Sequence, residues 1–395
     1  MRFGIFPEKP YLAGMKKYYL FIAAVCASLA VIACGGKPGT NPDPDPEPEP
    51  EPPVPVECPD FARGADISWV SEMEHDGRTF KKKDGTQANI FEVLKDCGMN
   101  AIRLRVWVDP YGGWSGTEDV VALGKRATAA GLALMVDFHY SDFFADPSRQ
   151  QVPAAWAADK DDLQKMCAHV AEHTTAVLQA FKEAGVAVHW VQVGNETRNG
   201  MLWPAGQLWN NSGNIPDGRK HFAQLYNAGY QAVKALYPNA LVMPHLNNAY
   251  DDNDWWFKEM KAAGLKMDAI ALSHYPQAES KFTASQYNQK AVDQINRLYA
   301  TYGVPVIVSE VGVKPSKSDA ASVMAGFMSA VKALEGCAGV FYWEPEVYGG
   351  WVPSVYKDAD AIYKYTGKRE TWRSYDQAAF TASGQPSAIL DCFAP

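Results

Sequence analysis

Eight apolar runs of strand-like length alternate with helix-like runs along most of the chain. The strand candidates are Ala65–Val70, Ala101–Val108, Leu132–His139, His189–Glu196, Leu241–Leu246, Ala269–Tyr275, Val304–Glu310 and Gly339–Glu344. The helix candidates between them are Ile90–Cys97, Val120–Ala130, Asp162–Ala184, Phe222–Leu236, Trp255–Ala263, Ser285–Tyr302 and Ala320–Leu334. Repeated strand–helix units favour one parallel, buried sheet, and eight units favour its closure into a barrel. The sequence therefore predicts an α/β fold, a single (β/α)8 TIM barrel.

Glycines follow several of the helix candidates. They are Gly98, Gly131, Gly185, Gly264 and Gly303, each shortly before a strand candidate. Helices commonly stop at glycine because it adopts a left-handed conformation without strain. These positions support the proposed alternation.

The composition narrows the class of partner. The 395 residues carry a formal net charge of −8, and 47% of them are hydrophobic, which excludes a wholly disordered or collagen-like chain. A mildly acidic chain lacks the basic clusters of nucleic-acid binders, so no nucleic-acid partner is expected. The 12 Trp and 19 Tyr exceed the needs of a core, and such amphipathic rings suit carbohydrate.

Residues 1–34 have the pattern of a bacterial secretory signal. Met15 precedes two lysines, and Tyr18–Ala33 is almost wholly apolar but short for a membrane span. The segment ends in Val-Ile-Ala-Cys, which resembles a lipobox, so we expect a true start at Met15 and a lipid on Cys34. Gly35 stands where inner-membrane retention uses aspartate, which favours an exported lipoprotein at the outer membrane or cell surface. Ordinary signal cleavage or an uncleaved anchor is the alternative.

Residues 35–57 are predicted to be a disordered linker. From Asn41 to Pro52, proline alternates with Asp or Glu, which favours an extended chain because proline restricts the backbone and the carboxylates repel one another. We expect this tether to hold a globular barrel, residues 58–395, away from the lipid anchor.

Polar residues gather where the strand candidates end. They are Asp66, Arg105, His139, Asn195, Glu196, His245, His274, Tyr275, Glu310, Trp343 and Glu344. The active site of a barrel is built on the face where the strands end. One such residue is weak support, but nearly every strand contributes one.

Glu196 and Glu310 end the fourth and seventh strand candidates. These strands face each other across an eight-stranded barrel, so the two carboxylates can flank a substrate. Cleavage of a glycosidic bond needs such a pair, at about 5–5.5 Å for retention or about 6.5–9.5 Å for inversion of the anomeric carbon. The alternative is that each Glu only forms an ion pair at a loop. Asn195 beside Glu196 makes the joint pattern harder to explain in that way.

Several longer strings resemble family 53 endo-β-1,4-galactanases. They are Gly64–Trp69, Ile102–Val108, Asp137–Asp142, Ala145–Pro147, Trp190–Glu196, Gly200–Pro204, Tyr342–Pro345 and the tail Asp376–Phe380. The resemblance implies a monomeric retaining endo-hydrolase of β-1,4-galactan, the side chain of pectin, with no required cofactor.

The resemblance also implies roles for single residues. Glu196 matches the acid/base and Glu310 the nucleophile, while Asn195 is expected to bind the 2-hydroxyl of the sugar. Arg105 is expected to orient the nucleophile and keep its pKa low. The other expected substrate contacts are Asp66, Trp107, His139, His274, Tyr275 and Trp343. His274 departs from the family pattern and is as readily explained as a packed histidine.

Other features leave alternatives open. Trp69, Trp107, Trp114, Trp203, Trp209 and Trp351 are candidate sugar platforms, and about half are expected in the core. Asp251–Asp254 resembles a Ca²⁺ loop, but a helix cap explains it with fewer assumptions, and the metal ligands are left unknown. Cys58 and Cys392 bracket the barrel and are a candidate disulfide staple.

Two rival functions share part of this sequence pattern. One is a barrel glycanase acting on mannan or cellulose, which the strings around Trp107, His139 and Trp203 disfavour. The other is a surface lipoprotein that only captures glycan, which has no reason to carry both Glu196 and Glu310.

Overall fold

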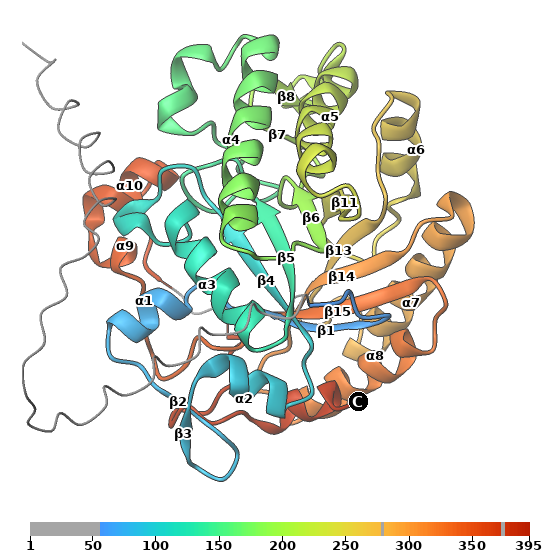
Figure 1. Ribbon diagram of the computed structural model, residues 1–395. Coiled ribbons are helices and arrows are strands. Elements are labelled where there is room, and N and C mark those ends of the chain that lie inside the picture. Colours follow the sequence, from blue (N-terminus) through green and yellow to red (C-terminus); the bar gives the residue numbers. More distant parts are fainter. Residues whose placement is uncertain (1–55, 278–279, 373–375) are drawn as a thin grey trace, which may run out of the picture. The chain divides into compact units, whose positions relative to one another are not determined.

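Parallel strands form a ring at the centre of the protein, as the computed structural model shows for residues 56–277, 280–372 and 376–395 (Figure 1). The strands are β1 (Ala62–Asp66), β4 (Ala101–Val106), β5 (Ala133–Phe138), β6 (Trp190–Val193), β11 (Leu241–Met243), β12 (His245–Leu246), β13 (Ile270–His274), β14 (Val306–Val311) and β15 (Cys337–Trp343). Their order is β11-β6-β5-β4-β1-β15-β14-β13-β12. This ring confirms the predicted (β/α)8 barrel.

The fifth barrel strand is split into β11 and β12. Pro244 stands between them and has no backbone N–H to donate. β11 pairs with β6, and β12 pairs with β13 on the other side. The two ends of the nine-stranded sheet therefore belong to one run of chain, which brings the ring nearly to closure.

Helices surround this ring (Figure 1). They are α1 (Val70–His75), α2 (Ile90–Asp96), α3 (Thr117–Ala129), α4 (Leu163–Glu183), α5 (Gly218–Leu236), α6 (Asp254–Ala262), α7 (Ala284–Tyr302), α8 (Ala320–Lys332), α9 (Ser354–Lys357) and α10 (Ala359–Thr366). Each predicted helix is present within a few residues of its expected bounds. The first strand differs, because β1 ends at Asp66 and Val70 already begins α1.

The glycines expected at helix ends do take the left-handed conformation, with φ from 66° at Gly303 to 93° at Gly98. Gly98 also packs against the end of the chain. A Cβ atom there would lie 2.5 Å from the carbonyl oxygen of Phe393, in the 3₁₀ helix Ala388–Phe393. Glycine is therefore needed at this position for two reasons.

Side chains alternate between the inside and the outside of the barrel. Ala101 of β4 and Ala271 of β13 belong to a small interior cluster, whereas Leu104 and Leu272 on the same strands belong to the large outer core. Successive residues of a strand point to opposite faces. On β4, the interior residues above Ala101 are therefore Arg103 and Arg105.

A bulge in β14 breaks this alternation. The register against β13 shifts so that Leu272 pairs with Val308 and Ser273 pairs with Glu310. Bulges re-aim side chains and occur often beside active sites. Here the bulge places Glu310 on the same face as the interior residue Ile307.

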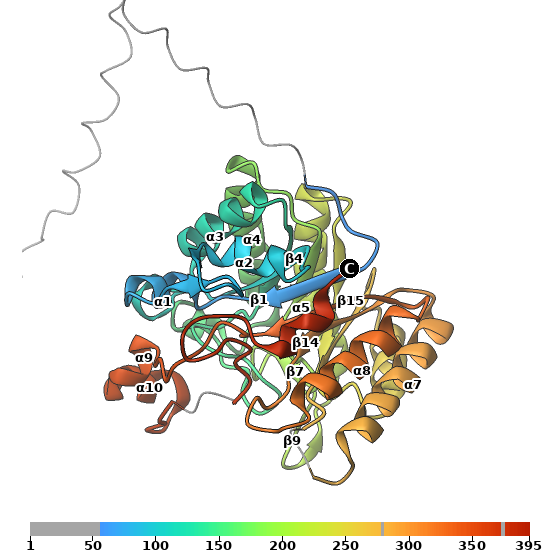
Figure 2. The ribbon, with the colours of Figure 1, turned by 90° about the horizontal axis from the view of Figure 1, so that it is seen from below.

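Smaller elements lie between the barrel units, among them the 3₁₀ helices Tyr111–Gly113 and Ala154–Asp159 and three pairs of short strands. The strand pairs are β2 (Phe80–Lys81) and β3 (Gln87–Ala88), β7 (Gly200–Met201) and β8 (Gly206–Gln207), and β9 (Trp209–Asn210) and β10 (Gly213–Asn214). Figure 2 shows α7 and α8 side by side, with α9 and α10 on the other side of the barrel.

The predicted signal, Cys34 and nearly all of the predicted linker lie outside the described residues. Among the residues that are described, no helix is long and apolar enough to cross a membrane. The predicted staple is wrong, because Cys58 and Cys392 are both free thiols. The Sγ of Cys58 bonds to the carbonyl of Pro59 and that of Cys392 to the carbonyl of Ile389.

Candidate active site

A cavity of about 260 Å³ opens at the carboxyl ends of the strands. Seven of the ten residues predicted for the site line it: Arg105, His139, Asn195, Glu196, Tyr275, Glu310 and Trp343. Five further residues complete the lining: Arg103, Phe144, Ala145, Asp146 and Gln377. The strand-end pattern of the sequence thus marks the right face of the barrel.

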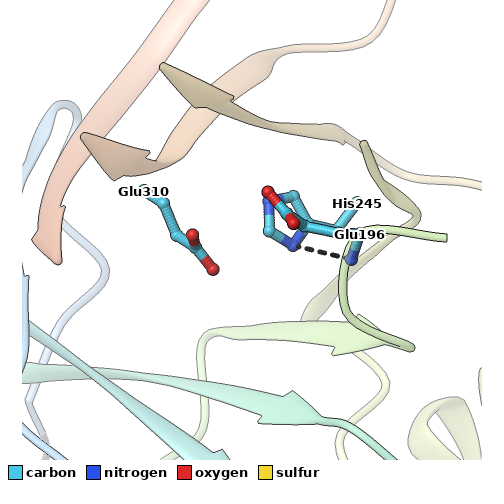
Figure 3. A group of neighbouring side chains, drawn as sticks. All are labelled: Glu196, His245 and Glu310. Carbon is cyan, nitrogen blue, oxygen red and sulfur yellow. Dashed lines mark hydrogen bonds between the residues drawn. The ribbon is translucent and has the colours of Figure 1, made fainter. Parts of the chain in front are cut away.

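Glu196 and Glu310 approach each other inside this cavity (Figure 3). Each offers a carboxylate oxygen, and these oxygens and a ring nitrogen of His245 lie within 4.8 Å of one another. The hydroxyl of Ser273 lies between the two acids, 2.7 Å from Oε1 of Glu196 and 3.3 Å from Oε2 of Glu310. This separation is close to the short distance that retaining glycosidases use, about 5–5.5 Å, and well below the 6.5–9.5 Å or so of inverting ones.

The turn after β6 brings Glu196 to the cavity. Gly194 has a φ of 87°, and a Cβ atom there would lie 2.6 Å from Cγ2 of Thr197. Glu196 itself has a φ of 46°, an uncommon value for a residue other than glycine. Strained backbone of this kind concentrates at functional sites.

Arg103, rather than Arg105, holds Glu310. Its Nη2 donates to Oε1 of Glu310 at 2.9 Å and to Asp137 at 2.8 Å, and its Nη1 donates to Asp66 at 2.6 Å. Burial opposes the charge of this guanidinium, but Asp137, Glu310 and Asp66 outweigh burial and raise the pKa of Arg103. The predicted role of Arg105 is therefore wrong: the arginine that holds Glu310 is Arg103, two residues earlier on the same face of β4.

Arg105 lies about 6.6 Å further along the strand, two residues towards its carboxyl end. There its Nη1 meets Glu344 at 2.7 Å instead of Glu310. Its guanidinium carbon lies 4.0 Å from the ring centroid of Trp69 and 4.6 Å from that of Trp107. Arg105 still lines the cavity, but it does not touch the predicted nucleophile.

The two acids differ in how easily they give up a proton. Burial, and then the charge of Glu310, raise the pKa of Glu196 to about 8. Burial also raises the pKa of Glu310, but Arg103 and the hydroxyl of Tyr275, 2.7 Å from Oε2, act against burial. Of this coupled pair, Glu196 is the member that keeps its proton at neutral pH.

Other predicted residues are fixed by their neighbours. His139 has Nε2 2.9 Å from Asp137, and its Nδ1 accepts from the backbone of Ala145 at 3.0 Å. The Trp343 ring meets the Tyr275 ring edge-on, with centroids 6.2 Å apart.

Three predicted contacts are outside the cavity lining. Asp66 is fully buried beneath it and serves Arg103 and Ser68. Trp107 is buried against Arg105. His274 follows the inward-facing Ser273, so it points outwards.

The outward side chain of His274 packs in the surrounding helices. Its Nε2 lies 2.8 Å from Oδ1 of Asn288 in α7, and its ring lies 4.4 Å from that of Phe327 in α8. Burial lowers its pKa to about 4. The prediction of a substrate contact at His274 is wrong, and its packed alternative is confirmed.

The six tryptophans proposed as platforms divide evenly. Trp69, Trp107 and Trp351 are buried in the core, whereas Trp114, Trp203 and Trp209 are partly exposed. This matches the expectation that about half belong to the core.

Two sets of residues carry side chains of the kinds that bind metal ions. Asp251–Asp254 leads into α6, which begins at Asp254, and Oδ1 of Asp252 accepts from the backbone of Asp254. Asn253, at the cap position of this helix, makes no side-chain cap bond. Glu196, His245 and Glu310 are close enough to share a cation, but both ring nitrogens of His245 bond to protein atoms, Asn195 and Ser273. The geometry therefore favours a hydrogen-bonded acid pair over a metal centre.

Comparison with known proteins decides the family. Residues 62–322 match the model of glycosyl hydrolase family 53. The chain belongs to this family. It is therefore a glycoside hydrolase, and the resemblance inferred from its motifs is confirmed.

Relatives match over most of the chain. It is 32% identical to the endo-β-1,4-galactanase of Bacillus subtilis, over 85% of each protein. It is 28% identical to the arabinogalactan endo-β-1,4-galactanase of Humicola insolens, over 84% of this chain and 98% of the relative.

Solved structures agree with these family 53 relatives. A fungal β-1,4-galactanase structure superposes with a TM-score of 0.68 at 27% identity, covering 84% of this chain and 98% of that one. A family 53 catalytic domain from Ignisphaera aggregans gives 0.69 at 26% identity, covering 87% and 98%.

Proposed function

We infer that this chain is a retaining endo-β-1,4-galactanase that cleaves β-1,4-galactan by two displacements. The observation that carries this inference is the close pair Glu196 and Glu310 in a family 53 barrel. The substrate is inferred from the relatives named above as endo-β-1,4-galactanases.

In the first displacement Glu310 is the nucleophile. Arg103 and Tyr275 each bond to one of its oxygens, so the carboxylate is held in a fixed orientation towards the sugar. Glu196 donates its proton to the glycosidic oxygen as the bond to the anomeric carbon breaks. The product is a glycosyl ester on Glu310 and a shortened chain that leaves.

In the second displacement Glu196 becomes the base. The ester on Glu310 has no charge, so its contribution to the raised pKa of Glu196 disappears and the pKa falls. Glu196 then takes a proton from the water that attacks the ester, and the sugar leaves with its original configuration.

A hollow beside the catalytic cavity supports internal cleavage. A hollow of about 400 Å³ shares Phe144 with the catalytic cavity and is also lined by Phe143, Trp203 and Tyr365. Aromatic rings beyond the acids offer surfaces for further sugars of a long chain.

The test is an assay of purified protein on linear β-1,4-galactan, β-1,3-linked galactan, mannan and cellulose. We expect β-1,4-galactan to lose viscosity early and to release galacto-oligosaccharides before free galactose. Faster cleavage of mannan or cellulose would overturn the substrate, and free galactose as the first product would overturn the endo mode.

We also propose export and lipid attachment at Cys34, from the sequence pattern alone. Cells fed labelled palmitate should label the protein, and Cys34→Ala should release it from the membrane fraction. Labelling of that variant would remove this proposal and leave the enzymatic one intact.

A further inference from the structure

Ser273 joins the proposed acid to His245. Its hydroxyl lies 2.7 Å from Oε1 of Glu196 and 2.8 Å from Nε2 of His245. Oε2 of Glu310, 3.3 Å away, is a third neighbour. A serine hydroxyl has one proton, so it can donate to only one of these neighbours. Which neighbour receives the proton determines whether Ser273 donates to Glu196 or accepts from it.

The side chain of Asn195 determines the position of the His245 proton. The amide nitrogen of Asn195 donates to the carbonyl of Ala145 at 2.8 Å, and its oxygen accepts from Arg103 at 3.0 Å. These two partners fix which end of the amide is oxygen. That oxygen lies 2.9 Å from Nδ1 of His245, so Nδ1 must carry a proton to bond with it.

A second contact at Nδ1 is longer, and Nδ1 cannot make both contacts as hydrogen bonds. The backbone N–H of Glu196 lies 3.3 Å from Nδ1, as the dashed line in Figure 3 marks. If Nδ1 accepted from this N–H, its lone pair would face the Asn195 oxygen at 2.9 Å. The shorter contact therefore decides the tautomer.

The other nitrogen of His245 is then an acceptor. His245 is fully buried, and burial together with the nearby Arg103 lowers its pKa well below the usual value, so the ring is neutral. A neutral ring with a proton on Nδ1 has a lone pair on Nε2, which accepts the Ser273 proton. Ser273 then has no proton left for Glu196 or for Glu310.

We propose that His245, in its Nδ1–H tautomer, makes the Ser273 hydroxyl an acceptor for Glu196 and so favours the protonated acid in the free enzyme. This inference rests on the proposed function of Glu196. Ser273 and His245 are positioning residues, because they act through Glu196 and do not line the cavity. The chain of donors runs from Glu196 to Ser273, to His245 and to Asn195.

Other titratable and charged groups surround Glu196 and His245. The titratable and charged groups that face Glu196 or His245 are Glu310, Asp146, Arg103, Tyr275, Asp137 and His139. None of them is altered in the variants below, so a change in the pH profile reports the hydroxyl.

The first test is the pH profile of kcat/KM for Ser273→Ala. Removing an acceptor weakens the protonated form, so the alkaline limb should move down by about half to one pH unit. The acidic limb, which reports Glu310, should stay in place. Ser273→Thr keeps a hydroxyl and should restore the original limb.

An alkaline limb that moves up in Ser273→Ala would show that Ser273 donates to Glu196, and an unmoved limb would show no coupling. Either result overturns the proposal. Thermal unfolding of both variants establishes that the folded enzyme is compared.

The second test needs neither variant activity nor galactan. Nitrogen-15 spectra of histidine-labelled wild-type protein, with the signal assigned by its loss in His245→Gln, should show a neutral ring protonated at Nδ1. A ring protonated at Nε2, or at both nitrogens, would overturn the relay. Lack of galactan cleavage with the expected tautomer would instead reject the proposed function alone.

Discussion

Arg103 and Arg105 lie two residues apart on the same face of β4, yet they have different surroundings. Arg103 is enclosed by the carboxylates of Asp66, Asp137 and Glu310. Arg105 has one carboxylate, Glu344, and aromatic rings on its faces. The same residue type thus serves two purposes. Only Arg103, which lies deeper in the barrel, contacts the proposed nucleophile.

The partners of the two arginines also differ in charge. Burial raises the pKa of Glu344 to about 8 even beside Arg105, so this acid can hold a proton at neutral pH. The pKa of Asp137 is lowered, because Arg103 and His139 outweigh the effect of burial. The carboxylates around Arg103 therefore depend on its charge more than Glu344 depends on the charge of Arg105.

The largest expected effect comes from changing the acid held by each arginine. Glu310→Gln should lower kcat by about four orders of magnitude or more, because no other described group is placed to form the ester. Glu344→Gln is the matched control and should keep most turnover, since glutamine resembles its protonated form. Equal losses of kcat in the two variants would contradict the distinction between Arg103, which holds the nucleophile, and Arg105.

The next effect is on stability. Arg103→Ala should lower the free energy of unfolding by about 3–5 kcal/mol, because it leaves buried carboxylates without a counter-charge. Arg105→Ala should cost clearly less, since Glu344 can take up a proton. Urea unfolding at pH 7 measures both, and an equal or larger loss for Arg105→Ala would contradict the comparison.

The pH dependence sharpens the roles of the two acids. Glu196 must be protonated to act as acid and its pKa is about 8, so kcat/KM should fall as the pH rises through about 8. In Glu310→Gln the neighbouring charge is gone, and the pKa of Glu196 should fall. Carbon-13 NMR of the labelled carboxyl follows this titration, and an unchanged pKa would refute the coupling.

The smallest effect is expected at His274. His274→Phe removes one hydrogen bond outside the cavity, so stability should drop by about 1 kcal/mol while kcat/KM on galactan is unchanged. A large loss of kcat/KM in folded protein would return this residue to the substrate site.

Much of the fold was predictable because the signals are local. The strand–helix alternation, the glycine stops and the polar strand ends identify the barrel and the face that carries Glu196 and Glu310. The inside–outside alternation of β13 also places His274 opposite Ser273, but the prediction did not use it.

Other features depend on information that a single strand does not carry. The side chains of Arg103 and Arg105 point to the same face of β4. Only the stagger of the neighbouring strands determines which of them reaches Glu310. The bulge that turns Glu310 inwards has no signature in its apolar run. Gln377 reaches the cavity from the tail after the last strand, where no periodic pattern indicates a position.

The central step of the proposed mechanism is the direct attack of Glu310 on the sugar, at short range from Glu196. Proton NMR during the hydrolysis of a β-1,4-galacto-oligosaccharide, recorded before the anomers equilibrate, tests this directly. The close carboxylates predict that the β-anomer appears first and the α-anomer grows only by mutarotation. The α-anomer appearing first would mean inversion by water, and Glu310 could not be the nucleophile.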